Sequence, residues 1–134
     1  MMSAYKNEIV EMPTKLMRLI NEQKVSELER MFNERIVEGW ELVSHTYLTS
    51  GGGGQTRCLY ITLKESSSAI KYKCDLVEMP LKFTTYLPEK KAAELSESFE
   101  VRLSEGWQLV AHTYLSASGV QEPAMIVTFK KDTE

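Results

Sequence analysis

The stretch EGWELVSHTYL, residues 38–48, returns almost unchanged as EGWQLVAHTYL at residues 105–115. The same offset of 67 residues carries the shorter matches YK at residue 5 and EMP at residue 11 onto residues 72 and 78. Between residues 5 and 48, 22 of 44 positions are identical to their partners 67 residues later. The chain therefore contains an internal duplication, and the repeated unit is the level at which the fold is predicted.

Each repeat is predicted to contain a strand followed by a helix. Residues 5–12 and 72–79 are expected strands, each ended by a proline that cannot donate to a central ladder. We expect an extended lead-in over 13–21 and 80–88. Apolar residues at spacings of three and four then indicate a helix with one buried stripe. The stripe holds Val25, Leu28, Phe32 and Ile36 in the first repeat, and Ala92, Leu95, Phe99 and Leu103 in the second.

Two further strands complete each repeat. Gly39 and Gly106 suit the left-handed cap that ends a helix, and the tryptophan that follows each of them is expected to hold the helix against the sheet. Strands are predicted over 40–48 and 107–115, then over 57–64 and 124–130. The segments between them, 49–55 and 116–123, have the composition of hairpin loops.

The predicted fold class is α+β, with two βαββ repeats in a single domain, 1–134. Repeat 1 spans 5–64 and repeat 2 spans 72–130. Because a unit of about 65 residues is marginal alone, the repeats are expected to share a core. We expect the third strand of each repeat to pair between the first two. A pseudo-twofold would then give one antiparallel sheet of about six strands with two helices on one face. The alternative is two small sheets packed face to face or closed into a barrel.

The overall composition restricts the class of function. Net charge is -3, with 16 basic and 19 acidic residues and no basic half, which argues against nucleic acid as a partner. No apolar run reaches the roughly 20 residues of a membrane span, so no membrane partner and a cytoplasmic location are expected. Cys58 and Cys74 form no CxxC and occupy different repeat positions, which favours free thiols and no cofactor.

The Tyr-Lys opening, the helix and above all the Gly-Trp-x-Leu-Val core resemble a family of small bacterial domains of unknown function with a YKV…EGWELV outline. The resemblance covers residues 5–64 and 72–130, with a longer lead-in after the proline and a tandem doubling. It implies the fold of each repeat and carries over no catalytic residue.

Simple alternation along the second strand predicts two different faces. Trp40, Leu42, Ser44 and Thr46 are expected beneath the helix. The opposite, open face is expected to gather a histidine, a tyrosine and a carboxylate from each repeat, and these are the candidate ligand- or partner-binding residues. They are His45, Tyr47 and Glu8 in the first repeat, and His112, Tyr114 and Asp75 in the second.

Several functions are open to such a face. In an enzyme, His45 or His112 would be a general base oriented by Glu8 or Asp75, but no nucleophile motif accompanies them, and no catalytic residue is assigned. Two histidines 67 residues apart predict no metal site. The glycine run 51–54 lacks the lysine of a phosphate-binding loop. A sheet face that mixes Val, Tyr and His favours a covered surface. The prediction is a binding or self-association module without evident catalysis: a homodimer or a complex with an unknown protein partner, with a small-molecule ligand or enzyme as the alternative.

Overall fold

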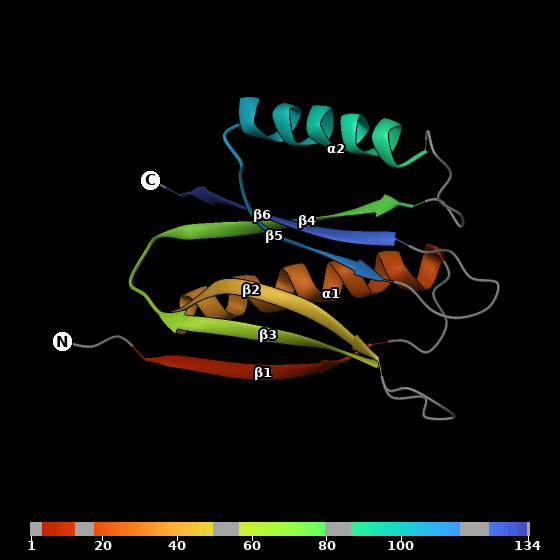
Figure 1. The fold of residues 1–134 in the computed structure, drawn as a ribbon. Helices are drawn as coiled ribbons and strands as arrows, with labels where there is room; N and C mark the ends of the chain where they lie inside the picture. The colour runs from red at the N-terminus through yellow and green to blue at the C-terminus, as the bar shows by residue number, and fades with distance from the viewer. Residues whose placement is uncertain (1–3, 13–17, 50–56, 80–86, 116–123, 134) are drawn as a thin grey trace.

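The computed structural model describes residues 4–12, 18–49, 57–79, 87–115 and 124–133 (Figure 1). The predicted loop segments 50–55 and 116–123, and with them the glycine run 51–54, lie outside this part of the chain. The elements, in chain order, are β1 (Tyr5–Glu11), α1 (Arg18–Val37), β2 (Trp40–Thr49), β3 (Arg57–Glu65), β4 (Ile70–Glu78), α2 (Leu87–Ser104), β5 (Gln108–Leu115) and β6 (Ala124–Asp132).

The α+β class and the position of the third strand are confirmed. The strands pair in the order β1-β3-β2 in the first sheet and β4-β6-β5 in the second, and every pair is antiparallel. The expectation of one sheet of about six strands is wrong, because the six strands form two separate three-stranded sheets. Each repeat builds its own sheet and leaves the contact between repeats to side chains.

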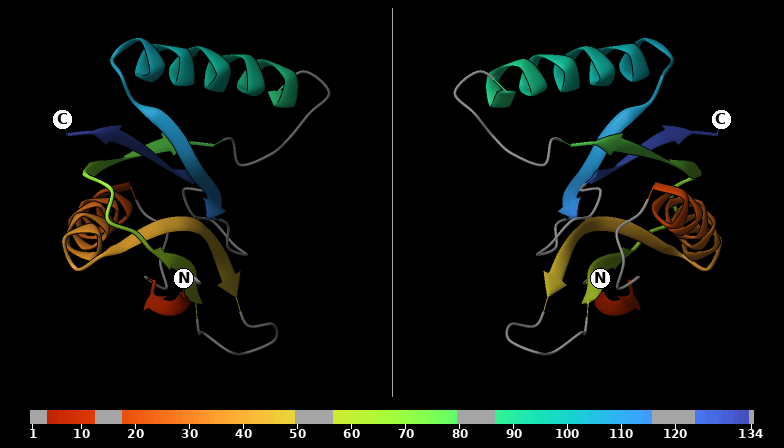
Figure 2. Two further views of the ribbon diagram at one scale, coloured as in Figure 1. Left: turned by 90° about the vertical axis from the view of Figure 1, so that its left-hand side faces the viewer. Right: turned by 90° about the vertical axis from the view of Figure 1, so that its right-hand side faces the viewer.

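The helices do not share one face of a sheet, contrary to prediction. The second sheet lies between α2 on one side and the first sheet with α1 on the other (Figures 1 and 2). α1 runs beside β4 as well as β2, and β2 lies beside β5. Among the described residues, the backbone of α2 comes close to the second sheet only along β5. The sheet of the second repeat therefore packs against the helix and the sheet of the first repeat.

Each sheet has a helix face, directed at the helix of its own repeat, and a back face on the other side. Leu42, His45 and Ile61 are on the helix face of the first sheet, and their partners Leu109, His112 and Val127 are on that of the second. The helix face of the first sheet packs against the back face of the second, so β6 is buried on both sides through Ile126, Val127, Thr128 and Phe129. One core thus unites both repeats, with Phe32, Leu59, Ile61 and Ile126 at its centre.

A β-bulge reverses the predicted faces of the second strand in both repeats. The pairing shifts register between Leu42 and Ser44, and again between Leu109 and Ala111. An extra residue in one strand moves every later side chain to the other face. His45 therefore points toward α1, and Thr46 points to the back face, opposite to the prediction. Strict alternation failed because it assumed a regular strand.

The ends of the two helices agree with the sequence prediction, whereas their starts lie earlier than predicted. α1 begins at Arg18 and not after the predicted lead-in, since the buried Asn21 is one turn before the buried Val25 and extends the stripe. α2 begins at Leu87, which is inside the predicted lead-in 80–88, and residues 80–86 of that lead-in lie outside the described part of the chain. Gly39 and Gly106 have φ of 94° and 93°, which confirms the predicted left-handed caps. The half-buried Trp40 packs at the core margin and lies beneath the Lys6 ammonium, 4.6 Å from the ring centroid.

Replacing Gly39 by alanine is expected to lower the free energy of unfolding by about 1–2 kcal/mol, because a side chain in the left-handed region crowds its own carbonyl. Beyond its chain neighbours, the added Cβ meets no atom closer than 3.8 Å, so the cost comes from the local backbone conformation and not from a clash with the rest of the fold. Urea denaturation measures the loss. Gly39→Asn is the control and should lose less, since asparagine tolerates this region. Equal losses in the two variants would contradict the explanation.

Candidate functional site

His45 is at the centre of the contact between the two repeats. Only 4% of it is exposed, and its ring stacks on Phe32 of α1 with centroids 6.2 Å apart. Both ring nitrogens bond to hydroxyls of the second repeat, Nδ1 with Thr113 and Nε2 with Thr128 at 3.0 Å. The residue that the sequence placed on an open face therefore joins one repeat to the other.

The hydrogen-bond network around His45 fixes its tautomer. The Thr113 hydroxyl donates to the carbonyl oxygen of His45 at 2.7 Å, so that hydroxyl accepts from Nδ1, which must carry the proton. Nε2 then accepts from the Thr128 hydroxyl, whose oxygen lies 3.4 Å from the Cys74 sulfur. Both ring nitrogens of the neutral imidazole therefore have a hydrogen-bond partner.

Burial, and to a lesser extent the charge of His112, lowers the pKa of His45 to about 4. A ring that is neutral at physiological pH, buried and bonded at both nitrogens offers no free lone pair to a substrate. Glu8 and Asp75 do not orient the histidines either, because each carboxylate is held by an arginine. His45 is therefore a structural residue of the interface.

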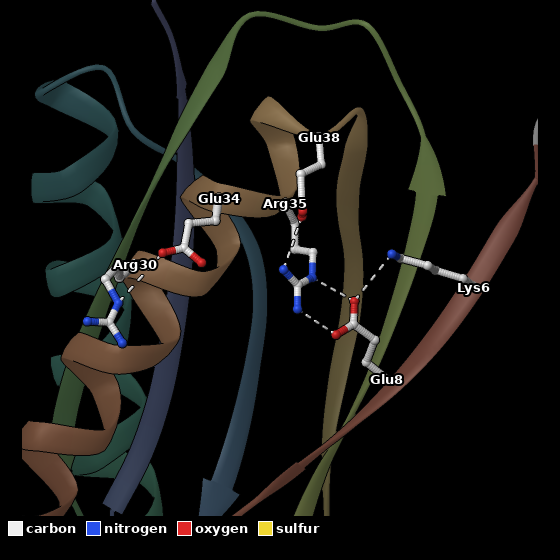
Figure 3. A network of polar contacts seen from close by, with 6 residues as sticks. All are labelled: Lys6, Glu8, Arg30, Glu34, Arg35 and Glu38. Atoms are coloured by element: carbon white, nitrogen blue, oxygen red, sulfur yellow. Dashed lines mark hydrogen bonds and ion pairs between the residues drawn. The ribbon is translucent and has the colours of Figure 1, made fainter.

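The two arginine–carboxylate pairs are the same contact made once in each repeat, and Figure 3 shows the pair of the first repeat. Arg35 donates from Nε and Nη2 to Glu8 at 2.7 and 2.8 Å, and from Nη1 to Glu38. Arg102 makes the same bonds to Asp75, at 2.7 and 2.9 Å, and to Glu105. The hydrogen bond from Arg35 holds the pKa of Glu8 below its ordinary value. Each pair ties the last turn of a helix to the first strand of its own repeat.

The outer edge of β4 is covered by side chains of α1. The Asn33 amide donates to the backbone oxygen of Tyr72 at 3.1 Å and accepts from its N–H at 2.7 Å. Glu29 accepts from the N–H of Cys74 at 2.7 Å. The Tyr72 hydroxyl in turn accepts from the N–H of Leu42, beside the bulge of β2. α1 thus satisfies an edge that would otherwise be free to pair with another strand.

Asn33→Ala is expected to lower the free energy of unfolding by about 1–3 kcal/mol, since it leaves two backbone groups of Tyr72 without their partner. Asn33→Asp is the matched variant: it keeps the acceptor and loses the donor, so its loss should be intermediate near neutral pH. Chemical denaturation gives both values, and amide exchange at Tyr72 gives the local effect. Unchanged protection of the Tyr72 amide in Asn33→Ala would contradict the assignment.

The second repeat exposes the positions that the first repeat buries. His112 is exposed, although it keeps a ring contact with Phe99 at 6.3 Å. Leu109 is 44% exposed where Leu42 is 3% exposed. Phe99 and Leu95 are only half-buried, whereas Phe32 and Leu28 are fully buried. We name this region the α2–β5 surface; it consists of Leu95, Phe99, Leu103, Leu109 and His112.

The back face of the first sheet shows the complementary asymmetry. Its exposed apolar residues are Tyr5, Ile9, Leu48 and Tyr60, with exposures of 66, 70, 46 and 37%. Equivalent residues of the third strands are 66 positions apart in the sequence, one fewer than in the earlier elements. The strand pairing shows this, because Tyr5 pairs with Lys64 and Tyr72 pairs with Lys130. The partners in the second sheet are Tyr72, Leu76, Leu115 and Ile126; Leu76 packs against the core, and the other three are buried in it.

The predicted site residues therefore separate into different environments. His45 is buried, His112 is exposed, Tyr47 and Tyr114 are half-buried, and Glu8 and Asp75 are held by arginines. Sequence reasoning missed Asn33, Thr113 and Thr128 as partners across the repeats. The signal available was the threonine that follows each histidine, Thr46 and Thr113. Of these two, Thr113 makes a hydrogen bond to the other repeat in the described residues.

No family model matches the chain, and no curated protein or solved structure matches it either. Over the described ranges, no group of three or more His, Cys, Asp or Glu is placed to hold a metal ion. Within the same part of the chain, no helix is long and apolar enough to cross a membrane. The thiols of Cys58 and Cys74 are free, and burial raises the pKa of Cys74 to about 12.

Proposed function

We propose that this protein is a non-enzymatic self-association module that binds through its α2–β5 surface. The observation that carries the proposal is the exposure of Leu109, Leu103 and His112, whose partners in the first repeat lie in or against a core. An apolar surface of this kind marks an interaction site when its members are contiguous. Leu109 and His112 lie on one face of β5, and Phe99 contacts the ring of His112.

A catalytic role has less support than binding. The carboxylates that would orient a histidine are engaged by arginines, and His45 is enclosed. His112 is accessible, and its ring contact is with the apolar Phe99, with centroids 6.3 Å apart. We therefore assign the protein a binding role and place it in the cytoplasm, in keeping with its free thiols.

We also infer that the chain is a duplicated unit of the kind found in the small bacterial domains with the YKV…EGWELV outline. The support is that both repeats make the same internal contacts: an arginine on a carboxylate, a lysine on a tryptophan, and a phenylalanine on a histidine. A twofold axis would bring like faces together. The packing of a helix face on a back face favours a head-to-tail relation of the repeats over the predicted pseudo-twofold.

The proposal is tested by sedimentation velocity of the intact chain across the micromolar range. We expect the sedimentation coefficient to rise with concentration, and Leu109→Glu to remove that rise by placing a charge in the apolar surface. The matched control is Val37→Glu, because Val37 is 86% exposed at the end of α1, away from this surface. A coefficient that stays constant for the wild type, or equal effects of the two substitutions, would contradict the proposal.

A further inference from the structure

The contact between the two repeats has two halves, and each half exists a second time without a partner among the residues that the structure describes. One half is the helix face of the first sheet together with α1. The equivalent surface of the second repeat is the α2–β5 surface, which is exposed. The other half is the back face of the second sheet, and its unpartnered repeat is the back face of the first sheet. In Figure 1, α2 and the first sheet lie at opposite ends of the molecule.

We propose that a second copy of this chain covers the α2–β5 surface with the back face of its first sheet, so that chains add head to tail. The proposal rests on the self-association proposed above and names the partner. The internal contact is the template: β4 lies beside α1, and β5 lies beside β2. Repeating it between chains places β1 of the second copy beside α2, and β2 of the second copy beside β5.

The polar groups needed for this repeat of the contact are present. His45 binds Thr113 and Thr128, and His112 would meet their partners Thr46 and Thr62 on the second copy. The Tyr72 hydroxyl accepts from the N–H of Leu42, and the Tyr5 hydroxyl of the second copy would accept from the N–H of Leu109. Thr46 is exposed and Thr62 half-buried, on the side of their sheet that is away from α1.

The apolar groups match in the same way. Ile9, Leu48 and Tyr60 stand where Leu76, Leu115 and Ile126 pack in the internal contact. The contact between chains differs from the internal contact at the strand edge that the helix covers. The residues of α1 that bind this edge, Asn33 and Glu29, are replaced in α2 by Glu100 and Ser96. Glu100 retains the acceptor and not the donor, so the contact between chains is weaker than the internal one.

A contact between two different surfaces does not close on itself after one addition. A homodimer with a twofold axis would use the same surface on both chains, whereas a head-to-tail contact leaves one free surface of each kind at the ends. Assembly therefore continues beyond two chains, to a ring or a filament, and blocking either surface stops it.

The test uses two variants, each blocked at one surface: Leu109→Glu on the α2–β5 surface and Ile9→Glu on the back face of the first sheet. Thermal melting confirms that each is folded; Leu48→Glu, at a site 46% exposed on the same back face, replaces Ile9→Glu if that variant fails to fold. Light scattering then measures the mass of each variant alone and of an equimolar mixture. We expect each variant alone to remain a single chain of 15.3 kDa.

The mixture is expected to reach twice the mass of one chain and to stop there, because each variant supplies the surface that the other lacks. Three results would overturn part of the account. Ile9→Glu that still associates alone would show that the α2–β5 surface meets a different partner surface, which leaves the self-association proposal standing. A mixture that stays at 15.3 kDa while the wild type associates has the same meaning. A wild type that never associates would remove both proposals.

Discussion

Replacing Phe32 by alanine is expected to lower the free energy of unfolding by about 3–5 kcal/mol, because it opens a cavity in the core that unites the repeats. The Phe32 side chain is fully buried between His45 and Tyr72, with ring centroids 6.2 and 6.0 Å away. Urea denaturation of the dilute protein measures the loss.

The duplication supplies a matched control for this prediction. Phe99 holds the same position in α2 and makes the corresponding ring contact with His112, together with an edge contact to Phe129, yet it is only half-buried. Phe99→Ala removes less area from contact and should cost about 1–2 kcal/mol. Equal losses at the two positions would contradict the difference in packing between the repeats, and with it the exposure of the α2–β5 surface.

Acidification from neutral pH is expected to lower the free energy of unfolding through His45 by up to about 3 kcal/mol. The folded state keeps the ring neutral down to a pKa of about 4, whereas the unfolded chain binds a proton near 6.5. The unfolded state therefore holds more protons between these values. The contribution is fully present above pH 6.5 and is lost as the pH falls toward 4.

His45→Gln isolates this contribution, because glutamine retains hydrogen-bonding groups and does not titrate. Its free energy of unfolding should depend less on pH between 6.5 and 4 than that of the wild type. Denaturation curves at several pH values give the comparison. A wild-type dependence that survives in His45→Gln would assign the acid sensitivity to carboxylates such as Glu8.

Much of the fold of each repeat was predictable from local chemistry. Pro13 and Pro80 follow the ends of the first strands, Gly39 and Gly106 end the helices, and the apolar stripe with Phe32 and Phe99 faces the sheet. These features depend on backbone limits and on periodicity, which a single sequence carries. The middle position of the third strand followed from the short connections of a βαββ unit.

The site was less predictable for two physical reasons. The bulges at Val43 and Val110 add a residue without any local signal such as glycine, so the histidines changed face. Packing between the repeats then gave identical residues different environments: His45 is buried and His112 exposed, although both lie in the same HTYL sequence. That difference depends on which face of each repeat packs against the other repeat, and a local sequence pattern does not encode it.

The most direct test of the central claim is the NMR signal of the two imidazole rings as the protein concentration is raised. The chain has two histidines, and only one of them lies on the proposed surface. We expect the ring signals of His112 to shift and broaden with concentration, while those of His45, which is already enclosed, stay unchanged. Ring signals of His112 that do not depend on concentration, in a sample that light scattering shows to be associating, would contradict this claim.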